Sequence, residues 1–363
     1  MIKSQLILKY LLRKNFNSIL IILTFSCLLF FLVDLVELMR RGSSKGIPTS
    51  ILVKIAFLHL PSLFSIILPT TFLLAVMHTY MQLNKHSELN IIRGAGISFW
   101  LFLMPALINA IFFSLLYVFF FNPVFAQMTV KFKSYESTYF KGSSGLHTVS
   151  PTGLWLKEVT ENKEYVINSS HYSPNERKLL NVKIFEFDNN DNFLRRIDSN
   201  TVLMFKDKWD LYDVKVVELN KIPLEFSKMS LNFDLSIEKI EQNFRSADTI
   251  NFWNLKKYIN ALKKSGFNAN KHIIYFNYLL SYPLILIAMV LVGFSLSIQR
   301  QRRKRNFLYI LIGIISGLFF HFLTDIFRTI GENGKLSVFF SVWVVPSIFI
   351  LILLSYLIHI EDG

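Results

Sequence analysis

Cysteine is nearly absent from this sequence of 363 residues. The one cysteine, Cys27, lies inside a long hydrophobic run, so the chain has neither a disulfide framework nor a cysteine metal site. Acidic residues are scarce as well, because 25 Asp and Glu stand against 39 Lys and Arg, for a formal net charge of +14. Such an excess can indicate nucleic-acid binding, but here the basic residues cluster at the ends of hydrophobic runs, where membrane topology requires them. We therefore expect no nucleic-acid partner.

Motifs for catalysis and nucleotide binding are missing too. The chain contains no Gly-x-x-x-x-Gly-Lys-Ser/Thr segment, so nothing in it can hold nucleotide phosphates as a P-loop does. No paired carboxylates and no nucleophile elbow stand out. We expect a protein that is not an enzyme and carries no cofactor or metal. The histidines of the hydrophobic segments lack metal-ligand spacing, and they are His59, His78, His321 and His359.

Long hydrophobic runs are what the sequence does contain. Apolar residues make up 52% of the chain, Phe alone occurs 36 times, and mean hydropathy is +0.40. Crossing a hydrocarbon core of about 30 Å takes about 20 helical residues, and six runs are long enough. The first is too long for a signal peptide and no small-residue cleavage site follows it. The runs cover about 16–36, 51–83, 97–121, 273–298, 307–327 and 338–358.

The basic residues of the short loops predict the orientation. The densest cluster, at 300–305, joins the fourth and fifth runs. If the runs alternate in direction, this cluster shares a side with the basic N-terminal segment and with Lys85 and Arg93, while Arg40, Arg41 and Lys335 lie opposite. The positive-inside rule then places both termini in the cytoplasm and the large polar stretch outside it.

The polar stretch divides the chain into predicted domains. Residues 1–126 hold the first three spans with a cytoplasmic loop at about 82–98, and 272–363 hold the last three. Between them we expect a domain at 127–248 and an amphipathic connecting helix at 249–271, whose apolar residues recur at helical spacing from Leu255 to Leu262 before a C-cap at Gly266. Short β-rich segments between turn signals predict an antiparallel sandwich or roll. They lie at 153–157, 165–167, 182–187, 202–205 and 214–219.

Two adjacent arginines near the outer membrane surface are the sharpest candidate site. Arg40 and Arg41 could bind a phosphate or carboxylate with paired N–H donors. They also run against the positive-inside bias, and anchoring to lipid headgroups explains them equally well. Lys131 and Lys133, at the expected entrance of the polar domain, pose the same choice with less force.

Carboxylates at membrane depth form a further group of candidates. Asp34, Glu37 and Asp325 lie near the outer ends of the first and fifth runs. Ionisable groups at this depth usually face a protein interior or an aqueous cavity, although simple interfacial placement is the alternative. Asp325 and Arg328 are three residues apart, a spacing that allows a local ion pair on a helix.

The loop at 82–98 is the candidate contact with a soluble motor protein. It could form a short surface helix with Glu88 and Arg93 exposed and with Leu89 and Ile92 as its apolar side. A solvated connector is the alternative. The second run contains Pro61 and Pro69, which predict a bent helix next to this loop.

Four segments carry a resemblance to a known family. They are Val-Asp-Leu-Val-Glu-Leu-Met-Arg-Arg-Gly at 33–42, Ser-Glu-Leu-Asn-Ile-Ile-Arg-Gly-Ala-Gly-Ile-Ser at 87–98, Gly-Leu-Trp-Leu-Lys at 153–157 and Tyr-Ile-Asn-Ala-Leu-Lys-Lys-Ser-Gly at 258–266. Over essentially its whole length the chain resembles the LptF/LptG family, the membrane subunits of the lipopolysaccharide export ABC transporter. The second segment is the most specific and departs from the family's form only at Gly94. The first and third resemble LptG more than LptF.

The resemblance implies a fold and a function. The fold is a polytopic α-helical membrane protein of the bacterial inner membrane, with six transmembrane helices and an inserted periplasmic antiparallel β-jellyroll domain. The function is that of a non-catalytic permease subunit that extracts lipopolysaccharide from the outer leaflet and passes it into a jellyroll path towards the outer membrane. Arg40 and Arg41 match family positions that contact the phosphates of the substrate, and the Glu88 loop matches the coupling helix that docks on the ATPase.

The resemblance also implies partners. They are an LptF-like permease subunit, an LptB-like ATPase dimer that uses ATP and Mg, LptC and LptA-like periplasmic proteins, lipopolysaccharide and membrane lipids. One departure is Leu279, which stands four residues before Pro283 where many members carry a lysine, so no role of that lysine is carried over. The alternatives are the LptF role in the same complex and a membrane-anchored periplasmic receptor or scaffold.

Overall fold

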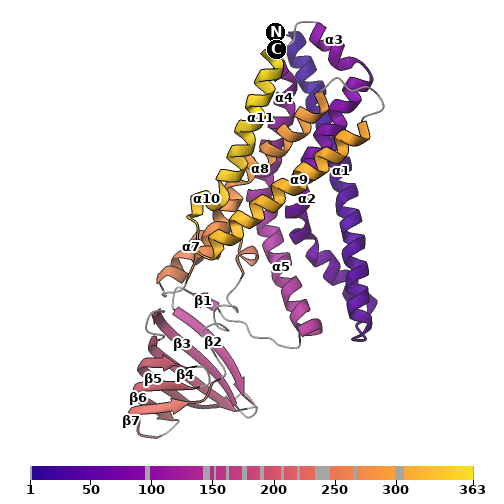
Figure 1. The fold of residues 1–363 in the computed structure, drawn as a ribbon. Coiled ribbons are helices and arrows are strands. Elements are labelled where there is room, and N and C mark those ends of the chain that lie inside the picture. Colours follow the sequence, from indigo (N-terminus) through magenta and orange to yellow (C-terminus); the bar gives the residue numbers. More distant parts are fainter. Residues whose placement is uncertain are drawn as a thin grey trace. The chain divides into compact units, whose positions relative to one another are not determined.

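The chain folds into two compact units in a computed structural model (Figure 1). The membrane unit comprises Met1–Lys141 and Ile274–Gly363, and the sheet unit comprises Gly142–Ile273. The structure describes residues 2–94, 99–141, 148–150, 153–160, 163–173, 178–188, 192–205, 208–218, 221–233, 246–264, 268–298 and 306–362.

Helices account for the described part of the membrane unit. Five are long and apolar enough to cross a membrane, and a shorter apolar helix, Val344–Ile360, follows them. The predicted helical membrane protein with an inserted antiparallel sheet is confirmed, with the difference that the sixth run is divided at Trp343. The helices are α1 (Ile2–Ser43), α2 (Thr49–Lys85), α3 (Glu88–Gly94), α4 (Phe99–Leu116), η1 (Tyr117–Phe121), α5 (Asn122–Glu136), η2 (Ser137–Lys141), α8 (Asn270–Ile298), α9 (Asn306–Glu332), α10 (Val338–Val342) and α11 (Val344–Asp362).

The third span is much longer than its apolar run. A continuous helix runs from Trp100 to Phe140 through α4, η1, α5 and η2, whereas the sequence predicted an end near 121 and a domain starting at 127. Tertiary packing explains the extension. Aromatic side chains of α5 and η2, including Phe132 and Phe140, pack against a buried cluster of α1 and α2 that contains Leu38 and Ile55. A polar-looking segment thus remains helical because one of its faces is covered.

Helix α8 is the most buried span and packs closely on α2. A Cβ at Gly293 would lie 2.6 Å from the carbonyl oxygen of Leu73, so only glycine permits this approach. Pro69 leaves the carbonyl of Ser65 without its helical partner, and the hydroxyl of Tyr282 on α8 donates to that oxygen at 3.1 Å. The interior of the membrane unit therefore satisfies a polar group that the proline exposes.

The two ends of the membrane unit differ in their contents. Both chain termini lie beside α3 at one end, as Figure 1 shows, while the turn between α1 and α2 lies at the other. Termini at the same end are what a chain with an even number of membrane-spanning helices requires. The two ends supply the two candidate sites described below.

The sheet unit contains one antiparallel sheet whose strands follow the order of the chain. The five predicted β segments coincide with parts of β2 to β6, except that Phe205 follows the end of β5 and residue 219 lies outside the described residues. Each strand is longer than predicted, and β7 adds an edge strand whose mostly exposed side chains give no burial pattern to read. Helix α7 (Phe252–Lys264) lies within the amphipathic helix predicted at 249–271 but is shorter, because α8 begins at Asn270. Gly266 lies outside the described residues. The strands are β1 (Thr148–Ser150), β2 (Gly153–Thr160), β3 (Lys163–Ser173), β4 (Lys178–Asp188), β5 (Phe193–Met204), β6 (Trp209–Glu218) and β7 (Leu224–Leu231).

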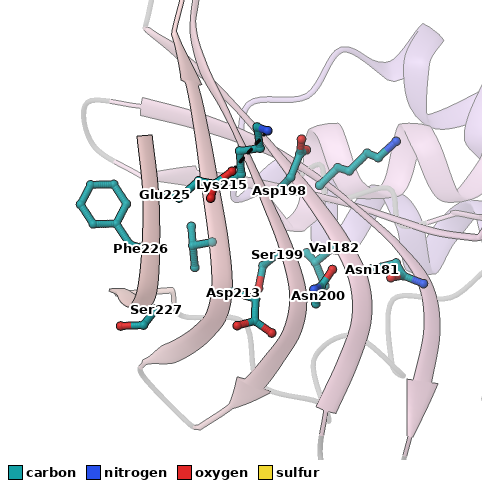
Figure 2. A pocket seen from close by; sticks show the side chains of 12 residues that line it. Asn181, Val182, Asp198, Ser199, Asn200, Asp213, Lys215, Glu225, Phe226 and Ser227 are labelled. Atoms are coloured by element: carbon teal, nitrogen blue, oxygen red, sulfur yellow. Dashed lines mark ion pairs between the residues drawn. The ribbon is translucent and has the colours of Figure 1, made fainter. Parts of the chain in front are cut away.

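The central strands all turn along one line of polar residues, which we call the kink row. It consists of Ser170, Asn181, Asn200, Asp213 and Ser227, which follow one another across β3 to β7. Four of them are labelled in Figure 2, where they lie side by side on successive strands. Asn181 and Asp213 adopt left-handed backbone conformations, with φ of 49° and 52°. The pairing register is the same on both sides of the row, so the strands bend together.

The kink row reverses which side chains point into the core. On β4 the buried residues Leu179 and Val182 are three positions apart, and on β6 Leu211 and Val214 have the same spacing. A regular strand buries every second residue, so the shift lets both halves of each strand face the same core. This bend gives a single meander the wrapped form of a jellyroll-like domain.

Buried serines stabilise the kink row. The hydroxyl of Ser169 lies 3.0 Å from the carbonyl oxygen of Leu180, and that of Ser199 lies 2.7 Å from the carbonyl oxygen of Tyr212. These carbonyls belong to the residues just before Asn181 and Asp213. The hydroxyls thus supply hydrogen bonds at the place where the strand ladder is interrupted.

The backbone of Asp213 predicts a test of the kink row. Asp213→Gly should leave stability nearly unchanged, because glycine adopts positive φ without strain. Asp213→Val should lower the free energy of unfolding by about 1–2 kcal/mol, because a β-branched residue is strained there. Denaturant unfolding followed by tryptophan fluorescence measures both. Equal stability of the two variants would contradict the strained conformation.

Asp210 on β6 predicts a pH dependence of the sheet. Hydrogen bonds from Lys228 and Ser230 lower the pKa of its carboxyl group to about 2 from an ordinary value of 3.8. The folded state therefore keeps the carboxylate ionised where the unfolded chain takes up a proton. The stabilisation is fully present above about pH 4 and is lost as the pH falls towards about 2. In Asp210→Asn, unfolding midpoints measured across this range should depend less steeply on pH than in the parent.

Candidate functional site

The predicted arginine pair lies at the C-terminal end of α1 and shares one carboxylate. Arg40 Nη2 lies 2.9 Å from Glu37 Oε1, and Arg41 Nε lies 3.2 Å from the same oxygen. The arginine side chains are 73% and 51% exposed, so both can still reach a second anion. Their position also suits the negative end of the helix dipole. Glu37 therefore forms ion pairs with both arginines, in addition to the interfacial position that the sequence suggested.

Two lysines extend this positive region, Lys45 in the turn after α1 and Lys54 on α2. Lys45 Nζ donates to the carbonyl oxygen of Phe140 at 2.6 Å, and Lys54 Nζ donates to the hydroxyl of Tyr135 at 2.6 Å. Sequence reasoning did not identify these aromatic partners, because they lie about 90 residues further along the chain. We call the four side chains Arg40, Arg41, Lys45 and Lys54 the cationic rim. With Glu37 as its one paired carboxylate, the rim carries three net positive charges.

Lys131 and Lys133 lie on α5 and not in the sheet unit. They flank Phe132, whose ring stacks on His59 with a centroid separation of 4.5 Å. Lys131 is exposed and Lys133 is half-buried. Phe132 also packs against the buried cluster beneath the cationic rim, so the two lysines lie beside that cluster.

Asp34 pairs with a histidine of the neighbouring helix. His59 Nδ1 lies 3.0 Å from both carboxylate oxygens of Asp34, and the Asp34 side chain is 13% exposed. The pair joins α1 to α2 within the span, as expected for ionisable groups that face a protein interior. Near the C-terminal end of α9, Asp325 lies 3.4 Å from His321, and Arg328 pairs with Glu332 at 3.3 Å. Asp325 and Arg328 were expected to be able to pair with each other, but each instead pairs with a different residue four positions away.

An apolar groove lies between α1 and α2 on the same two helices as the cationic rim. Its cavity volume is about 450 Å³, and its lining includes Cys27, Phe31, Phe57 and Phe64. Phe31 precedes Arg40 by nine residues, which is about 14 Å along an α-helix. An apolar chain with a negatively charged head could therefore occupy groove and rim together.

The predicted coupling residues lie on α3, at the opposite end of α1. Leu89, one of the two residues of the predicted apolar side, is buried, at 4% exposed. Ile91, which sequence reasoning did not single out, is 70% exposed. Ile92 and Arg93 belong to the helix, but their side chains lie outside the described part of the chain, as do residues 95–98.

Glu88 was expected to be exposed, and the structure corrects this expectation. Its side chain is 31% exposed and is held by the first helix. The hydroxyl of Tyr10 donates to Glu88 Oε2 at 2.9 Å, and Lys14 Nζ lies 3.3 Å from Oε1. We call Tyr10, Lys14 and Glu88 the α1–α3 clamp. The sequence shows that Tyr10 and Lys14 lie one helical turn apart and can act together, but no local pattern identifies Glu88 as their partner.

The sheet unit has a polar pocket over the kink row (Figure 2). Its volume is about 600 Å³, and charged side chains of both signs line it. Lys215 pairs with Glu225 at 3.4 Å, and Asp198 pairs with Arg196 at 2.9 Å. This pocket therefore offers little net charge to a ligand. Within the described residues, no group of three or more His, Cys, Asp or Glu side chains is placed to hold a metal ion.

Comparison with known proteins identifies the family. The family model described as "Lipopolysaccharide export system permease LptF/LptG" matches residues 9–359. Similar curated proteins include the "Lipopolysaccharide export system permease protein LptF" of Escherichia coli (strain K12) and that of Shigella flexneri. Each is 29% identical over 108 residues, which is 30% of this chain and 30% of the relative. The match thus spans less than a third of the length of these relatives.

Proposed function

Because this chain belongs to the lipopolysaccharide export system permease LptF/LptG family, we propose that it is the LptG-type permease subunit of an ABC transporter. It extracts lipopolysaccharide from the outer leaflet of the inner membrane and passes it to a periplasmic β-jellyroll bridge. The family and the apolar helices make the chain a multi-pass membrane protein. The proposed orientation has both termini in the cytoplasm and the sheet unit in the periplasm, in keeping with the basic loop segments.

One observation carries this proposal: α1 and α2 bear both the apolar groove and the cationic rim. A lipid with several acyl chains and phosphates on its headgroup needs both features, in the order in which they occur along α1. Arg40 and Arg41 would bind the phosphates through charge-assisted hydrogen bonds, with Lys131 and Lys133 as weaker contributors. Glu37 would then compete with the phosphates for the arginines.

The energy for extraction must come from outside the chain. Exposing acyl chains to water costs about 0.8 kcal/mol for each CH₂ group, so several chains do not leave a membrane spontaneously. The sequence has no nucleotide-binding motif, which favours a partner ATPase of the LptB type, bound as a dimer on the cytoplasmic side. ATP and Mg would be used by that partner. On this chain α3 would receive it, with the exposed Ile91 together with Ile92 and Arg93 as docking residues, while the buried Leu89 would hold the helix in place.

The α1–α3 clamp suggests how the movement reaches the substrate. Lys14 of the clamp and Arg40 of the rim lie on one continuous helix, 26 residues apart, which is about 39 Å. A displacement of α3 would therefore move α1 through Glu88 and shift the cationic rim at its far end. In this mechanism Glu88 is a positioning residue that ties the coupling helix to α1.

Further partners follow from the family. An LptF-like subunit would cover exposed apolar surface of α1 and α9, the two least buried of the long spans. LptC and LptA-like proteins would continue the path from the sheet unit. The second candidate is the LptF role in the same complex, and the names of the curated relatives favour it.

Loss of the clamp predicts uncoupled transport. In the complex reconstituted with its ATPase, Lys14→Met together with Tyr10→Phe should retain ATP hydrolysis but reduce lipopolysaccharide release per ATP by about tenfold, because a hydrogen bond to a charged group is worth about 1.5–3 kcal/mol. Lys9→Met, an exposed lysine on the same helix, is the matched control. Unchanged release per ATP would reject the clamp as a coupling element, and failure to associate with any ATPase would reject the proposed function itself.

The shared carboxylate predicts opposite effects of two substitutions at the rim. Glu37→Gln should tighten lipopolysaccharide binding severalfold, because both guanidinium groups lose their internal partner. Arg40→Gln with Arg41→Gln should weaken it, and the two effects should shrink at high salt. Binding is measured by photocrosslinking in nanodiscs. If neither variant changes binding, the rim anchors to lipid headgroups and does not select the substrate.

A further inference from the structure

Helix α7 separates its residues into two sharply different faces. Leu255, Ile259 and Leu262 are buried, at 0%, 7% and 0% exposed, and the helix packs beside β1. On the opposite face Trp253 is 59% exposed. The buried face explains why the helix folds with the sheet unit. It leaves the function of the other face open.

Lysines surround the exposed tryptophan. At 100° per residue, Trp253, Lys256, Lys257, Asn260 and Lys263 occupy an arc of about 120°. All five side chains are exposed, and α7 contains no acidic residue. We call these five residues the basic face. A large aromatic side chain among lysines is typical of helices that lie in the interface of an anionic membrane.

The lysines of the basic face differ from the other lysines of the sheet unit. Most exposed lysines of the sheet pair with carboxylates, as Lys163 does with Glu186 and Lys221 with Glu218, and Lys183 is an exception among the described residues. Among the described residues, none of Lys256, Lys257 and Lys263 has an ion-pair partner. Their charges therefore remain available to an external anion.

The chain itself keeps this face close to a membrane. Helix α7 ends at Lys264, and the span formed by α8 begins at Asn270. Six residues extend over at most about 20 Å, so the end of α7 cannot leave the neighbourhood of the lipid headgroups whatever the orientation of the sheet.

We propose that the basic face binds the anionic phospholipid surface beside α8. Trp253 enters the headgroup layer, and Lys256, Lys257 and Lys263 contact lipid phosphates. The contact anchors the end of the sheet unit at the point where the chain returns to the membrane. It depends on α8 being a span and not on the transported substrate.

A labelled full-length protein tests this proposal. Asn260→Cys, in a Cys27→Ser background, places an environment-sensitive fluorophore in the middle of the basic face. Quenching by acrylamide, a neutral quencher that the lipid charge does not repel, is compared between nanodiscs of phosphatidylcholine and nanodiscs with equal parts of phosphatidylcholine and phosphatidylglycerol. We expect quenching to fall severalfold in the anionic nanodiscs and to recover at high salt.

Two matched variants decide the role of the lysines. Lys256→Gln, Lys257→Gln and Lys263→Gln together should abolish the protection, since each lysine contributes about fivefold to surface binding. Lys183→Gln, Lys208→Gln and Lys215→Gln remove the same charge from the sheet and should leave the protection intact. Equal quenching in both lipid compositions, or protection that survives the triple change in α7, would overturn the proposal. Circular dichroism serves as the control that each variant is folded.

Discussion

The continuity of α1 is the constraint on which the two candidate sites depend. A helix in hydrocarbon must satisfy its backbone hydrogen bonds internally, and α1 does so without interruption from Ile2 to Ser43. One end of α1 carries Lys14 and Tyr10, which contact Glu88 of α3, and the other end carries the cationic rim. Between these two ends, Asp34 of α1 pairs with His59 of α2 and so joins the two helices. The two candidate sites, at opposite ends of the membrane unit, thereby lie on one continuous helix.

Charge pairing explains which cations are available to ligands. Within the membrane unit Glu37 offsets one of the two arginines, while Lys45 and Lys54 rest on aromatic partners that leave their charge uncompensated. Within the sheet, Glu186 is buried, and its burial opposes ionisation. Hydrogen bonds from Lys163 and Arg195 nevertheless lower its pKa below the ordinary value. Among the described residues, the lysines of the basic face of α7 have no carboxylate partner. Their charges are therefore available to a ligand, whereas the charges of Lys163 and Arg195 stabilise the fold.

The kink row shows how a meander of consecutive strands becomes a domain with an interior. Two left-handed residues and two buried serine hydroxyls reverse the alternation of side chains at the same position on neighbouring strands. Both halves of the sheet then bury apolar residues on one side. Because the polar residues of the row face outward, the pocket above them is hydrophilic and distinct from the apolar core.

The sequence by itself determined the spans, the inserted sheet, the amphipathic helix and the types of side chain at each end of α1. These features follow from local periodicity and from the length that a bilayer demands. Tertiary structure decided what those side chains do. It extended the third span to Lys141 by covering its aromatic face, gave Glu88 its partners on α1, and placed Phe140 against Lys45. Each of these contacts joins residues more than 70 positions apart, where neither helical nor strand periodicity carries information.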